Sequence, residues 1–209
     1  MEDVLDVYTR PYNPNKPVVC LDETSKQLVK EIKVPLPVKP GHGKYYDYEY
    51  ERNGVRNLFI LSEPLVGWRH VEVTEQRTKK DYAKILKYLV DERYPEAEII
   101  IIVQDNLNIH TPNALYQTFP PEEAKRILKK IEFHYTPKHG SWLNIAEIEL
   151  SVLTGQCLDK RLGDEESLKL EVACWEEQRN IKGTQVNWRF TTEDARIKLK
   201  RLYPLIEDK

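Results

Sequence analysis

The spacing of apolar residues changes several times along the chain, and each change predicts an element of secondary structure. Alternating apolar and polar residues indicate a half-buried strand, whereas a short continuous apolar run indicates a strand buried on both faces. Residues 99–103 are five consecutive β-branched residues, which predicts a central strand of a sheet. The predicted strands cover residues 17–21, 45–50, 55–61, 68–74, 98–103 and 132–135.

Other segments have helical spacing. An amphipathic helix is indicated where apolar residues recur at i, i+3, i+4 and i+7, as they do at Tyr82, Ile85, Leu86 and Leu89. Asp164 stands where it can cap a later helix. The predicted helices cover residues 78–93, 122–131, 146–158, 164–180 and 195–203.

Turn signals separate these elements. Asn53-Gly54 lies between two predicted strands and favours a β-hairpin formed by residues 45–50 and 55–61. Residues 35–42 contain three prolines and predict a loop. Residues 1–16 are rich in Pro, Asn and Asp, and we expect an extended, linker-like lead-in.

The order of the elements predicts the fold class. Early strands able to pair antiparallel are followed by alternating strands and helices. This order is typical of an α/β fold with a mixed sheet flanked by helices on both faces. We expect one such domain over residues 17–209.

The composition of the 209 residues is that of an ordinary globular protein, with 40% hydrophobic and 32% charged residues. The longest apolar run is too short to cross a bilayer, and the N-terminus has no signal-peptide pattern. We therefore expect no membrane association and a cytoplasmic location. Cys20, Cys157 and Cys174 are odd in number and widely spaced, which favours reduced thiols over disulfides or a zinc site.

The charge balance argues against an autonomous DNA-binding domain. The chain has 32 basic and 34 acidic residues and a formal net charge of −2, whereas contacts with phosphates favour a basic surplus. If DNA is the substrate, either the basic residues cluster in space or another chain or domain supplies most of the affinity.

Asp22 and Asp105 each follow an apolar run that predicts a strand. Sites in open α/β sheets form at the carboxyl ends of the strands. Two aspartates that meet there repel each other unless a cation neutralises them. Their hard oxygen atoms suit Mg²⁺ or Mn²⁺ better than zinc.

A third acid is available at the start of a later predicted helix. Glu147 and Glu149 point about 200° apart on a helix, so only one of them can face the aspartates. Taken singly, each of the three acids is also an ordinary turn or capping residue. His139 and Asn144 lie in the same segment and are candidates for supporting the acids.

Three phrases of the sequence occur in a recognisable order: VVCLDETSK, DNLNIHTP and FHYTPKHGSWLNIAEIELS. Together they resemble the catalytic domain of DDE transposases, specifically the mariner-type superfamily and its bacterial insertion-sequence branch. The resemblance covers about residues 17–203 and implies a ribonuclease-H-like fold in a bacterial, nucleoid-associated protein.

The resemblance also implies roles for individual residues. Asp22 and Asp105 match the first and second catalytic aspartates, and Glu147 matches the third acid. These acids would hold two Mg²⁺ (or Mn²⁺) ions. Forty-one residues separate Asp105 from Glu147, more than in the eukaryotic relatives, so Glu149 stays open as an alternative third acid.

Further residues near the acids are candidates for contacts with DNA or for support of the site. Asn106 and His110 follow Asp105, and His139 and Asn144 precede Glu147. The last predicted helix offers more distant phosphate contacts at Arg196, Lys198, Lys200 and Arg201.

The activity implied by the resemblance is DNA strand cleavage followed by strand transfer, with a TA dinucleotide as target and a homodimer in a synaptic complex. Full-length members of the family carry an N-terminal helix-turn-helix region, so we expect recognition of the transposon ends to lie in a separate or missing part. Two other hypotheses remain open. One is a hydrolytic ribonuclease-H-like nuclease, and the other is an inactive truncated or domesticated remnant.

Overall fold

A five-stranded mixed sheet with the order β3-β2-β1-β4-β5 forms the centre of the molecule. The computed structural model describes residues 1–32, 49–138 and 140–203. Antiparallel pairing joins β1 to β2 and β2 to β3, and parallel pairing joins β1 to β4 and β4 to β5. The predicted mixed α/β sheet is confirmed. The strands are β1 (Val18–Glu31), β2 (Tyr50–Glu63), β3 (Trp68–Thr74), β4 (Ile100–Gln104) and β5 (Ile131–Tyr135).

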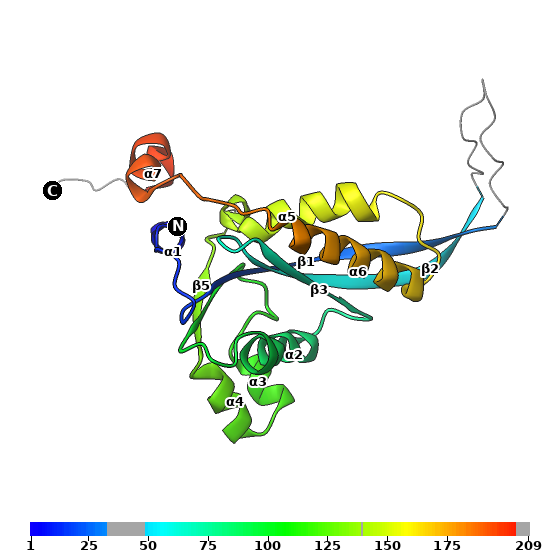
Figure 1. Cartoon of the computed structure of the whole chain (residues 1–209), viewed down its shortest axis with the longest axis horizontal. Helices are drawn as coiled ribbons and strands as arrows, with labels where there is room; N and C mark the ends of the chain where they lie inside the picture. Colours follow the sequence, from blue (N-terminus) through cyan, green and yellow to red (C-terminus); the bar gives the residue numbers. More distant parts are fainter. Residues whose placement is uncertain (33–48, 139, 204–209) are drawn as a thin grey trace.

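Helices cover both faces of this sheet (Figure 1). Ile100 and Ile102 of β4 belong to one hydrophobic core, and Ile101 and Val103 belong to the other, as the period of two along a strand requires. The first core is closed by α2 (Lys79–Tyr88), α3 (Asn113–Thr118) and α4 (Pro121–Leu128). The second is closed by α1 (Glu2–Tyr8), α5 (Ile145–Leu153), α6 (Glu165–Lys182) and α7 (Thr192–Lys198).

Several predicted helices are confirmed together with their caps. Thr78 forms a capping box with Asp81 at the start of α2, and Asp164 accepts the backbone N–H of Ser167 at the start of α6. The π-helical segments η1 (Leu89–Arg93) and η3 (Thr154–Leu158) extend α2 and α5 to about the predicted ends. The short helix α3 was not predicted.

The predicted hairpin around Asn53-Gly54 is wrong. β2 runs through both residues and pairs with β1, so the hairpin is formed by β1 and β2 instead. Gly54 has a φ of +84° beside a register shift in the β1–β2 ladder. Its backbone freedom therefore serves a bulge rather than a turn. The predicted loop over 35–42 and most of the predicted strand over 45–50 lie outside the described residues.

The expectation of an extended lead-in over residues 1–16 is also wrong, because residues 2–8 form α1. Val4, Leu5 and Val7 are buried in the core that α5 and α6 share, so the burial of one apolar face supports this short helix. Tyr8 ends the helix, and its hydroxyl donates to the carbonyl of Leu143 over 2.8 Å. The lead-in is thus part of the domain.

Two further findings concern the thiols and the helices. Cys20, Cys157 and Cys174 are all free, and the first two are buried. Among the described residues, none of the helices is both long and apolar enough to cross a membrane.

The turn between β2 and β3 lies against the end of α6. Gly67 has a φ of +75°, and a Cβ atom there would lie 2.5 Å from the carbonyl oxygen of Gly183, the C-cap of α6. Such a distance leaves no room for a side chain. Glycine at position 67 therefore allows the two backbones to approach closely.

We expect Gly67→Ala to lower the free energy of unfolding by about 1–3 kcal/mol or more, because a left-handed φ strains any other residue and the new methyl group meets backbone. The measurement is urea denaturation followed by circular dichroism. Gly155→Ala is the control, since a Cβ there meets nothing within 4 Å. It should be neutral or stabilising by up to about 1 kcal/mol. Equal losses in both variants would contradict the close-approach argument.

Candidate active site

Asp22 and Asp105 lie side by side where the parallel pairing of β1 with β4 ends. The last pair of that ladder is Cys20 with Val103, and each aspartate lies two residues further along its strand. Asp105 directly follows β4, as predicted. Asp22 does not end its strand, since β1 continues to Glu31 in partnership with β2. The pairing of β1 with β4 thus stops before the two aspartates.

The carboxyl group of Asp22 is poorly neutralised. Its Oδ1 accepts the backbone N–H of Glu23 over 2.8 Å, and its Oδ2 lies 3.3 Å from the amide nitrogen of Asn144. Burial, with added repulsion from the charges of Glu23, Asp105 and Glu147, raises the pKa of Asp22 to about 7. The shift therefore reflects mainly the burial of Asp22, and the neighbouring acids add to it.

The environment of Asp105 lowers its pKa, whereas that of Asp22 raises it. Its Oδ1 accepts hydrogen bonds from Nδ1 of His110 over 2.6 Å and from the backbone N–H of Leu107 over 3.0 Å. The hydrogen bond from His110 lowers the pKa of Asp105 below its usual value. Asn106, the next residue, donates to the carbonyl of Thr136 over 2.9 Å, which ties this loop to the end of β5.

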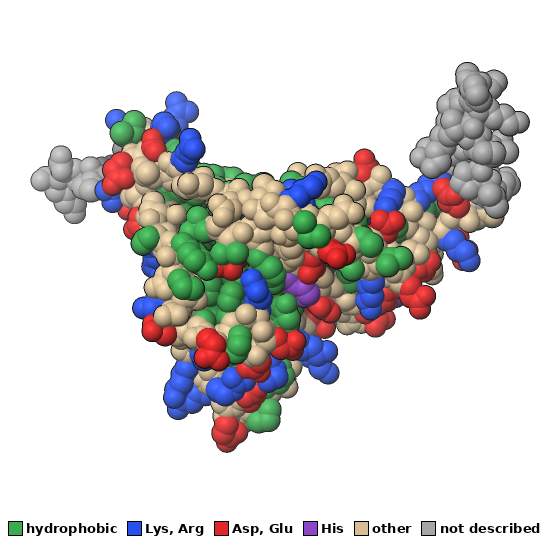
Figure 2. Space-filling model, viewed as in Figure 1, with side chains coloured by type: hydrophobic (Ala, Val, Ile, Leu, Met, Phe, Trp, Pro, Cys, Tyr) green, Lys and Arg blue, Asp and Glu red, His purple; other side chains and the backbone are tan. Residues whose placement is uncertain are grey.

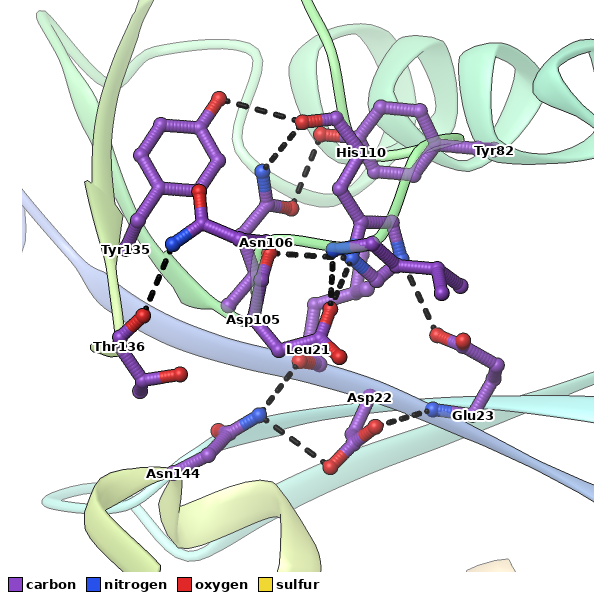
Figure 3. Close-up of polar contacts among 12 residues, drawn as sticks. Leu21, Asp22, Glu23, Tyr82, Asp105, Asn106, His110, Tyr135, Thr136 and Asn144 are labelled. Atoms are coloured by element: carbon purple, nitrogen blue, oxygen red, sulfur yellow. Dashed lines mark hydrogen bonds and ion pairs between the residues drawn. The ribbon is translucent and has the colours of Figure 1, made fainter. Parts of the chain in front are cut away.

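His110 lies between Asp105 and Glu23 (Figure 3). Its side chain is 0% exposed, and Nε2 lies 3.0 Å from Oε2 of Glu23. The ring also packs on Tyr82, with 4.9 Å between ring centroids. Burial alone would lower the pKa of His110, but the hydrogen bonds to Asp105 and Glu23 outweigh it and raise the pKa to about 9. A side chain so enclosed supports Asp105 rather than reaching a phosphate.

Asn144 joins the third segment of the site to β1. Its side chain caps α5 by accepting the N–H of Ala146, and it donates to the carbonyl of Leu21 over 2.9 Å. Glu147 then falls in the first turn of α5 and is half-buried. Its charge is among those that raise the pKa of Asp22, so Glu147 acts on the aspartate site.

Glu149 belongs to a different cluster. Its two oxygens lie 2.7 and 2.8 Å from the guanidinium group of Arg69, and Arg179 approaches within 3.1 Å. The side chain of Glu149 is 2% exposed. Both oxygens are therefore occupied by cations of β3 and α6, on the side of α5 away from Asp22.

The remaining predicted residues lie elsewhere. His139 is outside the described residues. Arg196 pairs with Glu2 over 2.7 Å and Lys198 with Asp194 over 3.0 Å, so two of the basic residues proposed for phosphate contact are balanced by neighbouring acids. Acidic and basic side chains are intermixed over the face drawn in Figure 2. Lys200 and Arg201 lie in η4 (Lys200–Leu202) after α7.

Glu23, Arg69 and Arg179 were missed in the sequence. Glu23 had one usable signal: it follows Asp22 in a strand, so its side chain must point to the opposite face. The arginines had none, because their partner Glu149 comes from a distant part of the chain.

The donor set fits hard divalent cations. Carboxylate oxygens are the ligands that Mg²⁺ and Mn²⁺ prefer, and a cation would offset both the burial of the Asp22 carboxylate and its repulsion by Asp105 and Glu147, which raise its pKa. Within residues 1–32, 49–138 and 140–203, no three His, Cys, Asp or Glu side chains stand close enough to share one ion. Asp22, Asp105 and Glu147 would therefore have to draw closer on binding.

We expect Asp22→Asn to stabilise the metal-free protein as pH rises. The folded pKa near 7 lies above the usual value of 3.8, so the native carboxyl group costs stability progressively between about pH 4 and 7. The gain from the variant should be near zero at pH 4 and on the order of 4 kcal/mol at pH 8, given about 1.4 kcal/mol per pKa unit over a shift of roughly three units. Urea denaturation in EDTA at both pH values measures it.

Asp105→Asn is the matched control, and its effect on the free energy of unfolding should have the opposite sign. The pKa of Asp105 is lowered, so the ionised group stabilises the fold above the ordinary carboxyl pKa, and this contribution is lost in acid. The variant should be destabilised at neutral pH and approach wild type in acid. Effects of the same sign for the two variants would contradict the electrostatic assignment.

Comparison with known proteins matches most of the chain to a family. A family model described as DDE superfamily endonuclease matches residues 17–169. No curated protein matches the chain. The Mos1 mariner paired end complex with Mg has a TM-score of 0.56 at 20% identity, covering 94% of this chain and 57% of that one. The corresponding complex with Mn has a TM-score of 0.55 at 19% identity, covering 87% and 55%.

A retroviral assembly has a related fold. The simian T-cell lymphotropic virus intasome in complex with PP2A regulatory subunit B56 gamma has a TM-score of 0.50 at 14% identity, covering 96% of this chain and 60% of that one. At these identities the likeness establishes the ribonuclease-H-like fold. The chain spans just over half the length of the Mos1 chains. Since the family model covers most of its residues, the chain belongs to the DDE superfamily endonuclease family.

Proposed function

We propose that this chain is the catalytic part of a transposase of the mariner-type superfamily, bacterial insertion-sequence branch. It would cut DNA strands and join the freed ends to a target. The observation that carries the proposal is the register of β1 and β4, which brings Asp22 beside Asp105 in a DDE-family domain. Paired acids of this kind serve phosphoryl transfer, in which positioning and charge stabilisation supply most of the catalysis.

Asp22, Asp105 and Glu147 are proposed to hold two Mg²⁺ or Mn²⁺ ions. When bound, such a pair of ions activates the attacking oxygen and stabilises the leaving one. The protein's own contribution is orientation. Asn144 holds Asp22, His110 holds Asp105, and the first turn of α5 carries Glu147.

Glu147 is proposed as the third acid in preference to Glu149. A ligand must offer a free oxygen, and both oxygens of Glu149 are held by Arg69 and Arg179. Freeing a buried carboxylate from such partners costs about 3–5 kcal/mol. Glu147 has no such cost, and its charge already acts on Asp22.

DNA is the proposed partner, with two copies of the chain in a synaptic complex and TA as target. The Mos1 structures are described as paired-end complexes, one of them with the left transposon end, and another as a strand transfer complex. The net charge of −2 supports a further part of the protein, or another chain, as the source of most DNA affinity.

We expect Asp22→Ala, Asp105→Ala and Glu147→Ala each to lower Mn²⁺-dependent strand cleavage by at least about a hundredfold, because each removes charge stabilisation from the transition state. Glu149→Ala should instead destabilise the fold by about 3–5 kcal/mol, since it leaves buried arginines unpaired. Cleavage of an oligonucleotide and thermal unfolding are measured on the same samples. A folded, active Glu147→Ala protein would exclude Glu147 as the third acid.

The kind of product tests the transposase assignment separately. A DNA substrate with a free 3′-hydroxyl at a transposon end is incubated with a labelled TA-containing target and Mn²⁺. Strand transfer should give a product in which the two DNAs are covalently joined. Cleavage without joining would contradict the assignment and leave a hydrolytic nuclease. No chemistry with intact folding would leave an inactive remnant.

A further inference from the structure

Glu23 and His110 form a buried pair of charged side chains that leads to Asp105 (Figure 3), and Arg77, whose side chain is 43% exposed, contacts Glu23. Arg77 Nη1 lies 3.2 Å from Oε1 of Glu23, and Oε2 of Glu23 lies 3.0 Å from Nε2 of His110. Nδ1 of His110 in turn donates to Oδ1 of Asp105 over 2.6 Å. We propose that Glu23 is a positioning residue that fixes Asp105 through His110. The inference rests on the proposed role of Asp105 as a metal ligand.

Glu23 is placed for this role by the alternation of β1. Asp22 points toward α5, and the next side chain points through the sheet toward α2, where its exposed fraction is 3%. Each of its carboxylate oxygens has a cationic partner, Arg77 or His110. A buried carboxylate occupied in this way supports its neighbours and is not itself available to a metal.

The imidazole of His110 has little freedom to turn. Its side chain is fully buried, Tyr82 covers the ring, and the hydroxyl of Tyr135 donates to the backbone carbonyl of His110 over 3.2 Å. Carboxylates lie on both sides of the ring, as they do around histidines in the surroundings of metal sites: Asp105 accepts a hydrogen bond from Nδ1, and Glu23 makes an ion-pair contact with Nε2. Within the part of the chain that the structure describes, Nε2 of His110 and Oε2 of Glu23 have no hydrogen-bond partner, so this ion pair is what compensates for the burial of both atoms.

The position of these charged side chains explains why the fold needs them. Backbone pairing between β1 and β4 stops at Cys20 and Val103, so no strand hydrogen bond spaces the two aspartates. The contact between Glu23 and His110 joins β1 to the loop after β4 at that level. It therefore sets the separation of Asp22 from Asp105. Within the part of the chain that the structure describes, the side-chain hydrogen bonds of Asp105 involve only Oδ1, so Oδ2 is available to a ligand.

The test is Mn²⁺ affinity, measured by isothermal titration calorimetry on the whole chain without DNA. Glu23→Gln keeps the size of the side chain and removes its charge, and it should weaken Mn²⁺ binding by about tenfold or more, the usual effect of losing such a support. His110→Asn should weaken it similarly. Because Glu23 acts through His110, the double variant should be no weaker than the worse single variant.

Glu63→Gln is the matched control. Glu63 is also a buried carboxylate of the sheet, held by the hydroxyl of Tyr94 over 2.7 Å, but it contacts none of the site residues named above. It should lower thermal stability to a similar degree and leave Mn²⁺ affinity unchanged. Loss of affinity in Glu63→Gln as well would show a general effect of destabilisation and overturn the proposal.

Asp22→Ala distinguishes a failure of the positioning role of Glu23 from a failure of the proposed metal site. If Asp22→Ala abolishes Mn²⁺ binding while Glu23→Gln binds like wild type, the positioning role is overturned and the proposed function stands. If Asp22→Ala binds Mn²⁺ like wild type, the proposed metal site itself fails. Additive losses in the Glu23 and His110 variants would also overturn the positioning role, because they would show independent effects.

Discussion

The parallel register of β1 and β4 is the constraint on which the site depends. With Cys20 opposite Val103, Asp22 and Asp105 share both a level and a face of the sheet. A shift of one residue would turn one aspartate to the opposite face. The register is held by the two cores, because each strand alternates its apolar side chains between them. The same register is therefore required for the geometry of the site and for the packing of the cores. A substitution in β4 that alters the packing also shifts Asp105.

A second constraint fixes the rotation of α5. Asn144 holds its start to β1, and Glu149 holds the next turn to Arg69 and Arg179. Buried ion pairs add little net stability because desolvation offsets the attraction. Their effect here is to orient α5. With Glu149 turned toward the arginines, Glu147 lies on the side of the aspartates, where its charge acts on Asp22.

Local patterns predicted those parts of the fold that local physics decides. The strand over 68–74 and the cap at Asp164 were right, because alternation and side-chain capping act within a few residues. The hairpin at Asn53-Gly54 was wrong because a dipeptide that favours positive φ fits a bulge as well as a turn. The helix over residues 2–8 was missed because tertiary burial, and not its own sequence, supports it. For the site, the position of Asp105 directly after a strand could be predicted, whereas Asp22 lies within β1 and not at its end. The role of Glu149 could not, since it depends on arginines distant in sequence.

Charge at the site and charge over the whole chain lead to one conclusion about DNA. Asp22, Asp105 and Glu147 are three acids whose charges act on one another, since repulsion from Asp105 and Glu147 adds to the effect of burial in raising the pKa of Asp22. Basic residues such as Arg196 and Lys198 are paired with acids, so they offset little of the repulsion that a phosphate would meet. On the proposed function, divalent cations therefore have two tasks, since they must neutralise the acids before a phosphodiester can approach and then take part in its cleavage. Binding of DNA at this face should accordingly depend on metal as strongly as catalysis does.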